Sequence, residues 1–96
     1  MANRAHSGSW QTYLVEHYRP GVGVDELERS VASVRDAVVA MQSEGKAVQH
    51  VRSTIVPADE SFLCVVDACS EELVHEAYAR VGIPVDRISV AISQDD

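Results

Sequence analysis

The feature of this sequence that most constrains its fold is the run of residues 12–18, which reads TYLVEHY. Its β-branched, aromatic and other apolar side chains, with no glycine or proline among them, favour an extended and largely buried strand. Successive side chains of a strand alternate between the two faces of its sheet. The two ionisable residues of the run, Glu16 and His17, should therefore point to opposite faces of a central strand.

Two later stretches carry the period of an amphipathic helix. In the first, between Asp25 and Gly45, apolar side chains recur at steps of three and four residues: Leu27, Val31, Val34, Ala37, Val38 and Met41. Asp25 and Glu28 have the spacing of a capping box, and Gly45 is the predicted end of the helix. The second helix is expected to begin after Ser70, an N-cap residue, and to end at Gly82.

Three further segments predict strands. Residues 48–56 alternate as an edge strand does, with His50 on the solvated side and Val51 on the buried side. Residues 61–68 form a dense apolar run, which predicts a central strand that pairs with residues 48–56 as a hairpin. Residues 87–93 alternate again and are expected to close the domain as its last strand.

The order strand, helix, strand, strand, helix, strand predicts a ferredoxin-like βαββαβ sandwich of the α+β class. Right-handed crossovers then place both helices on one face of a four-stranded antiparallel sheet. We assign residues 1–10 to a flexible N-terminal lead-in and residues 11–96 to a single domain of this type. The other face of the sheet is left uncovered, and because it carries apolar side chains we expect a second copy to stack on it in a homodimer.

Composition and charge narrow the possible functions. With 46% hydrophobic and 24% charged residues, the 96-residue chain has the composition of a folding domain. Eight basic against fifteen acidic residues give a formal charge of −7, which repels a phosphate backbone and argues against nucleic acid as a partner. No apolar run approaches the ~20 residues that span a bilayer, and the first ten residues lack the apolar segment of a signal peptide. We therefore expect a cytoplasmic protein without a membrane partner, in which Cys64 and Cys69 stay reduced.

The sequence offers ligands for a metal ion more readily than a catalytic motif. It has no glycine-rich phosphate loop, nucleophile elbow or ordered Ser-His-Asp set, which favours a non-enzymatic role. Imidazole, carboxylate and thiolate groups bind first-row transition metals, and five residues are candidate ligands: Glu16, His17, His50, Cys64 and Asp67. Because no HxH or CxxC spacing occurs, such a site would be assembled across strands or across a dimer. His75 could also chelate a metal loosely with Glu71 or Glu72 at helical spacing.

Three stretches of the chain resemble one known family. They are residues 13–17, residues 62–68 and above all residues 79–88, which read ARVGIPVDRI. The resemblance covers most of the chain after the lead-in. It is to a family of small ferredoxin-like nickel-binding proteins, formerly described as a domain of unknown function and typified by an actinobacterial nickel-binding protein. The resemblance implies a ferredoxin-like fold, dimerisation and the binding of nickel as Ni²⁺.

One position departs from the family pattern. Many members carry a histidine in the second helix shortly before the Gly-Ile-Pro turn, where this chain has Ala77 and Tyr78. Its helical histidine, His75, lies about one turn earlier and on a different side. The sequence thus supports a small dimeric protein that binds nickel or a similar divalent transition metal. The alternatives are a small-molecule-binding or enzymatic domain with a cleft near Glu16, and a plain protein-interaction module.

Overall fold

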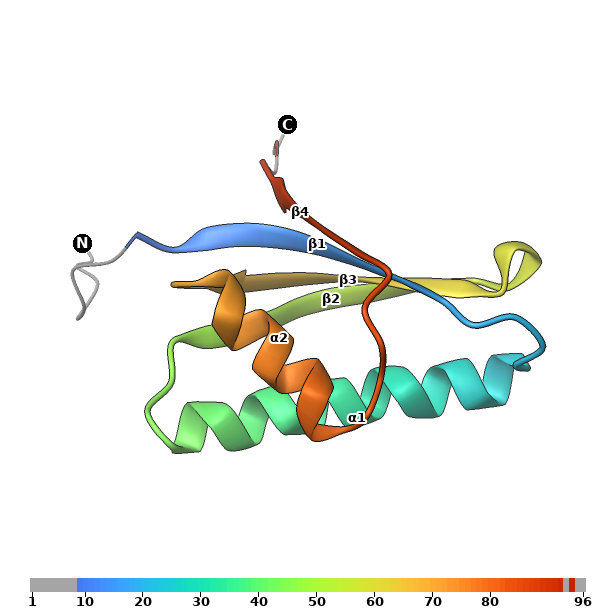
Figure 1. The fold of residues 1–96 in the computed structure, drawn as a ribbon, viewed down its shortest axis with the longest axis horizontal. Coiled ribbons are helices and arrows are strands. Elements are labelled where there is room, and N and C mark those ends of the chain that lie inside the picture. Colours follow the sequence, from blue (N-terminus) through green and yellow to red (C-terminus); the bar gives the residue numbers. More distant parts are fainter. Residues whose placement is uncertain (1–8, 93, 95–96) are drawn as a thin grey trace.

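The computed structural model describes residues 9–92 and residue 94. In chain order it contains β1 (Gln11–Tyr18), α1 (Val24–Ser43), β2 (Val48–Val56), the 3-10 turn η1 (Pro57–Asp59), β3 (Ser61–Ala68), α2 (Glu71–Arg80) and β4 (Arg87–Ala91). The strands form a four-stranded antiparallel sheet in the order β2-β3-β1-β4. Both helices lie on the same face of this sheet (Figure 1). The predicted ferredoxin-like α+β fold is therefore confirmed.

Two predicted segments extend beyond the described residues. Residues 1–8 of the expected lead-in fall outside them, as does residue 93 of the expected last strand, which the structure ends at Ala91. Within the described part of the chain, neither helix is long and apolar enough to cross a membrane.

The start of α1 differs from the prediction, whereas its end agrees with it. Gly23 is its N-cap and no side chain caps it, so the capping box predicted for Asp25 and Glu28 is wrong. The helix starts one residue earlier than expected, which places Asp25 inside the first turn. There its negative charge interacts favourably with the helix dipole and stabilises the helix. Gly45 confirms the predicted end: its φ is 86°, and the N–H of the next residue bonds back to the helix at 3.0 Å.

α2 is capped as the sequence predicts. The Ser70 hydroxyl accepts a hydrogen bond from the backbone N–H of Leu73 at 3.3 Å. At the other end Gly82 has a φ of 68°, and the N–H of Ile83 donates to the carbonyl of Tyr78 at 3.1 Å. This closure directs the chain after α2 back toward the end of β1, where β4 begins (Figure 1).

The hydrophobic core fills the space between the sheet and the two helices. The buried core side chains come from β1, β2, β3 and both helices, and the largest of them are Tyr78, Phe62, Leu27, Met41, Val15 and Val34. His17 lies among them, with only 1% of its surface exposed. The prediction that Glu16 and His17 face opposite sides of a central strand is thus confirmed.

A β-bulge changes the predicted alternation of β2. His50 is paired with Val66 and Arg52 with Val65, so Val51 is an extra residue between them. As a result His50, expected on the solvated side, faces the helices and is half-buried, whereas Val51, expected on the buried side, is exposed. The predicted alternation failed here because one inserted residue exchanges the faces of every side chain beyond it.

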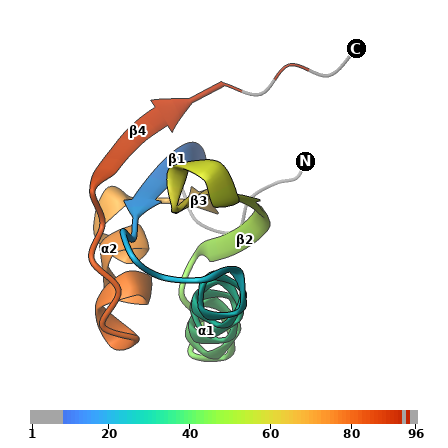
Figure 2. The same ribbon diagram turned by 90° about the vertical axis from the view of Figure 1, so that its right-hand side faces the viewer.

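The other face of the sheet has no helix over it (Figure 2). We call this surface the open face, and the pairing of the strands assigns to it a mixture of apolar and charged side chains: Leu14, Glu16, Arg52, Leu63, Val65 and Asp67. Its three large apolar side chains are only half-buried. The sequence predicted this uncovered face, and the stacking of a second copy on it remains a prediction.

Candidate functional site: the end of β1 and the exposed side of α2

The five predicted metal ligands are distributed over both faces of the sheet. His17, His50 and Cys64 face the helices, whereas Glu16 and Asp67 lie on the open face. Within residues 9–92 and 94, no three histidine, cysteine, aspartate or glutamate side chains converge on a position for a metal ion. One protomer therefore does not assemble these five residues into a site.

His17 is held in the core by an aromatic stack and one hydrogen bond. Its ring lies 4.4 Å from that of Phe62, at 18° to it, and 4.5 Å from that of Tyr78. Its Nδ1 lies 2.9 Å from the carbonyl oxygen of Pro84, which can only accept, so Nδ1 carries the proton. Burial lowers the pKa of His17, an effect that this carbonyl partly opposes. The imidazole is therefore neutral, with a buried Nε2 that has no hydrogen-bond partner in the described part of the chain.

Cys64 belongs to a chain of polar groups on the helix side of β2 and β3. His50 Nε2 lies 2.7 Å from Ser53 Oγ, which in turn lies 3.0 Å from Cys64 Sγ. Burial raises the pKa of the Cys64 thiol and also that of the neighbouring Tyr78 hydroxyl. Cys64 is fully buried and its thiol lies against Ser53 within the core, which describes a structural side chain.

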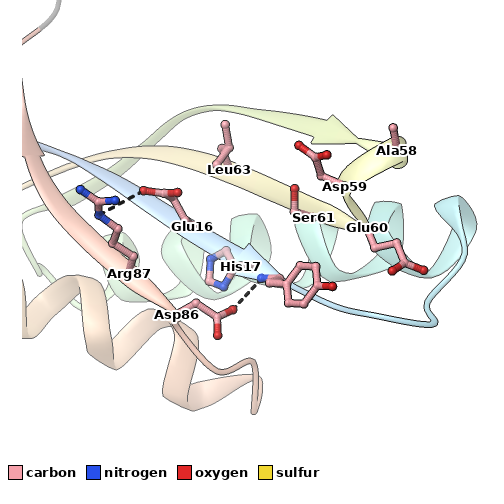
Figure 3. Close-up of a pocket in the computed structure, with 10 residues that line it drawn as sticks. Glu16, His17, Ala58, Asp59, Glu60, Ser61, Leu63, Asp86 and Arg87 are labelled. Carbon is pink, nitrogen blue, oxygen red and sulfur yellow. Dashed lines mark hydrogen bonds and ion pairs between the residues drawn. The ribbon is translucent and has the colours of Figure 1, made fainter.

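The segment that carries the family resemblance holds the end of β1 in place. The carbonyl of Pro84 accepts a hydrogen bond from His17 Nδ1, and two residues later the carboxylate of Asp86 accepts one from the backbone N–H of Tyr18 at 2.6 Å. The backbone N–H of Asp86 donates to the carbonyl of Glu16 at 3.0 Å. Arg87 Nε lies 3.6 Å from Glu16 Oε2 (Figure 3). This part of the resemblance therefore has a structural explanation, because its residues bind Glu16, His17 and Tyr18 in turn.

A pocket of about 510 Å³ opens at this end of the sheet. Its lining combines charged, polar and apolar residues: Glu16, His17, Tyr18, Ala58, Asp59, Glu60, Ser61, Leu63, Asp86 and Arg87. Figure 3 shows Glu16, Asp59 and Leu63 on the open side of the sheet, while the ring of His17 lies on the helix side. The side chain of Glu16 is 35% exposed and close to Arg87, so it is not the buried carboxylate of an apolar cleft.

An imidazole and a carboxylate meet on the exposed side of α2. His75 Nε2 lies 3.0 Å from Glu71 Oε2, one helical turn away, and the two side chains are 50% and 53% exposed. Cys69 precedes the same helix by two residues. Burial raises the pKa of Tyr13, and the nearby charges of Glu71 and Cys69 raise it further. The sequence indicated this pair through its spacing of four residues.

The position that departs from the family pattern lies next to His17. Ala77 and Tyr78 are both buried, and the ring of Tyr78 contacts that of His17. His75 projects to the surface instead, as the sequence predicted. Sequence reasoning did not foresee the contact between Tyr78 and His17, because it depends on how α2 crosses β1 and no local pattern encodes that crossing.

Fold and site together define a small ferredoxin-like α+β domain with an open sheet face and an exposed histidine–carboxylate pair on α2. The chain belongs to the family described as nickel responsive protein SCO4226-like, which it matches over residues 13–90. The crystal structure of SCO4226 from Streptomyces coelicolor A3(2) superposes with a TM-score of 0.67 and 20% sequence identity, covering 88% of this chain and 99% of that one. At this identity the likeness supports the shared fold alone. The comparison with curated proteins gives no match.

Proposed function

We propose that the protein binds a divalent transition metal, with Ni²⁺ as the metal suggested by its family, through Glu71 and His75 on α2. The observation that carries this proposal is the 3.0 Å contact between His75 Nε2 and Glu71 Oε2 on an exposed helix surface. Imidazole nitrogen and carboxylate oxygen are ligands that nickel accepts. Two protein ligands leave positions for water, so we expect weak and reversible binding, as suits a protein that responds to the metal.

The residues predicted from sequence fit a nickel ion less well within one protomer. The ring of His17 is enclosed between two aromatic rings, and the side chain of Cys64 is fully buried. Glu16 and Asp67 are separated from both by the sheet itself. The proposal includes the cytoplasmic location expected from the sequence.

A small-molecule site near Glu16 is the alternative function. The pocket of about 510 Å³ has a volume suited to such a ligand. Its rim, however, carries four carboxylates and one arginine, whereas small-molecule sites are lined mainly by apolar side chains. The charged rim fits a protein partner better than an apolar ligand.

Isothermal titration of tag-free protein with Ni²⁺ tests the metal proposal. The wild type should bind about one equivalent, and His75→Gln should abolish the heat, because the variant loses the only imidazole of the pair. His50→Gln is the matched control: it removes an imidazole elsewhere and should bind as the wild type does. A wild type that gives no heat beyond dilution would refute metal binding.

Two further variants locate the site if binding occurs. Glu71→Gln should weaken binding, since it removes the charge of the carboxylate ligand. If His75→Gln binds normally and His17→Phe does not, the ligand is the buried histidine and the assignment to α2 is wrong. Cys69→Ser asks whether the nearby thiol joins the metal, which the wild-type complex would also reveal as a sulfur-to-nickel charge-transfer absorption band.

A further inference from the structure

We infer, on the basis of the metal site proposed above, that metal bound by Glu71 and His75 regulates the pocket at the hairpin end of the sheet. The metal opposes local opening of α2. Through the segment that follows this helix, residues 81–87, it then holds one wall of the pocket more firmly against the end of β1.

A metal bridge between Glu71 and His75 favours the helical state of α2. The two residues are one helical turn apart, and His75 Nε2 lies 3.0 Å from Glu71 Oε2. In an extended chain the same four-residue step spans about 13 Å, so the two ligands are far less often within reach of one ion. A ligand that binds one conformation better shifts the population toward that conformation. Metal binding therefore opposes the unwinding of α2.

The order of α2 depends on its surroundings. The helix has ten residues, fewer than the ~12–15 at which an isolated helix becomes stable in water. Its inner side carries the buried residues Val74, Ala77 and Tyr78, so packing against the core keeps it folded. An element of this kind can open locally without unfolding of the whole domain. The metal adds one more contact to those that prevent such opening.

The two ends of α2 are held in different ways. In the last turn, the guanidinium of Arg80 donates to both carboxylate oxygens of Glu44 on α1, at 2.6 and 2.9 Å. At the first turn, the hydroxyl of Ser70 accepts one hydrogen bond at 3.3 Å. Glu71 lies in this first turn. The metal therefore strengthens the end of the helix opposite to the one that Arg80 anchors.

Tyr78 and the residues after it connect α2 to the buried histidine of β1. The ring of Tyr78 lies 4.5 Å from that of His17, and its backbone carbonyl accepts the N–H of Ile83 at 3.1 Å. The next carbonyl oxygen, that of Pro84, lies 2.9 Å from His17 Nδ1. The chain then continues alongside β1 into β4 (Figure 1). The position of α2 is therefore transmitted to β1 both by a side chain and by the backbone.

The same segment ends in two residues that line the pocket, Asp86 and Arg87. The carboxylate of Asp86 accepts the N–H of Tyr18 at 2.6 Å, and its own N–H donates to the carbonyl of Glu16 at 3.0 Å. Arg87 Nε lies 3.6 Å from Glu16 Oε2 (Figure 3). Connected packing and hydrogen bonds of this kind carry coupling between separate sites. Holding α2 in place therefore also holds this wall of the pocket.

Hydrogen–deuterium exchange of the full chain, measured by mass spectrometry with and without Ni²⁺, tests the inference. At a free Ni²⁺ concentration of about 100 times the dissociation constant, exchange in residues 71–80 should slow about tenfold or more, because binding at that excess favours the closed state up to about a hundredfold. Exchange in residues 81–87 and 16–18 should slow about threefold or more if these segments open together with α2. Residues 57–61 in the hairpin turn are the internal control and should not change.

Asp86→Ala separates the helix from the strand. It removes the carboxylate that binds the N–H of Tyr18 and leaves both metal ligands unchanged. Ni²⁺ should therefore still slow exchange in α2 of this variant, but should lose most of its effect on the end of β1. Asp59→Ala, which changes another carboxylate of the same pocket, is the matched control and should keep both effects.

The calorimetric titration with Ni²⁺ decides the metal site separately from the coupling. A titration without heat refutes the metal site and, with it, the regulation of the pocket. Heat together with slower exchange confined to residues 71–80, or with no change in exchange, leaves the metal site in place and overturns the coupling to β1. An Asp86→Ala variant in which residues 16–18 respond as in the wild type overturns the route through Asp86. An equal effect of Ni²⁺ on exchange in His75→Gln would place the responsible ion elsewhere and also overturn the inference.

Discussion

The two sides of β1 each carry apolar residues and one ionisable residue, but one side is buried and the other is partly exposed to solvent. On the helix side Tyr13, Val15 and His17 are all buried, and the single imidazole is kept neutral. On the open side Leu14 and Glu16 remain partly accessible, and the carboxylate lies near Arg87. The same strand therefore contributes to a closely packed core on one face and to a partly exposed surface on the other.

This difference separates stability from function in the molecule. On the helix side, the histidine that looked most like a metal ligand is part of the packing. Accessible charged groups lie on the open face and on the outer sides of both helices. We expect substitutions on the two sides of the sheet to have correspondingly different consequences.

The largest contrast should appear between Phe62 and Leu63, neighbours on β3 that face opposite sides. Phe62 is fully buried, so Phe62→Ala should cost about 3–5 kcal/mol of unfolding free energy through lost burial and the cavity left behind. Leu63→Ala should cost about 1 kcal/mol or less, since the side chain is already partly exposed. Urea unfolding at low protein concentration, where association contributes least, measures both values. Equal costs would mean that the two faces do not differ as described.

The buried histidine makes the helix side sensitive to acid. Because the pKa of His17 is lowered in the fold, the unfolded chain binds more protons below pH 6.5, and stability falls as the pH falls. The stability is fully present above pH 6.5 and decreases from there toward the folded pKa, by up to about 1.4 kcal/mol per pH unit for this group. Thermal or urea unfolding between pH 7.5 and pH 5 measures the slope.

His17→Phe is the variant that assigns this slope. It keeps an aromatic ring in the stack and removes the titrating group, so the pH dependence should become shallower. Burial and nearby Arg35 also lower the pKa of His50, so a slope of the same sign should persist in the variant. An unchanged slope in His17→Phe would show that the buried imidazole does not control acid sensitivity.

The smallest effect is expected at the rim of the open end, where Asp86 holds the end of β1. Asp86→Ala should cost about 1 kcal/mol, because the hydrogen bond to Tyr18 is charge-assisted but exposed to solvent. Asp86→Asn keeps an acceptor oxygen and should cost less than Asp86→Ala. If the two variants lose equal stability, the hydrogen bond is not what anchors the strand.

Most of the fold followed from local patterns in the sequence. The capping residue Ser70 and the stops at Gly45 and Gly82 were all found in their predicted roles, because each acts through its own backbone neighbours. The sequence failed where one residue changed the register of a strand, as the bulge at Val51 did for His50. No property of an isolated valine signals such an insertion.

The candidate site was less accessible to the sequence. Glu16 and His17 were correctly assigned to opposite faces, and the Glu71–His75 spacing was recognised, because alternation and helical period are local. Which of these side chains could reach a metal or a partner depended on distant segments: Tyr78 and Pro84 enclose His17, while Arg87 lies beside Glu16.

The sequence by itself thus determined the order of the strands and helices and, except at the bulge in β2, the faces of their side chains, since these follow from periods of two and 3.6 residues. Only the tertiary structure decided that His17 is packed and neutral, that His50 turns inward, and that an acidic pocket lies at the hairpin end of the open face. The reason is physical. Burial, desolvation and charge separation belong to groups brought together in space, and the residues that cause them are far apart along the chain.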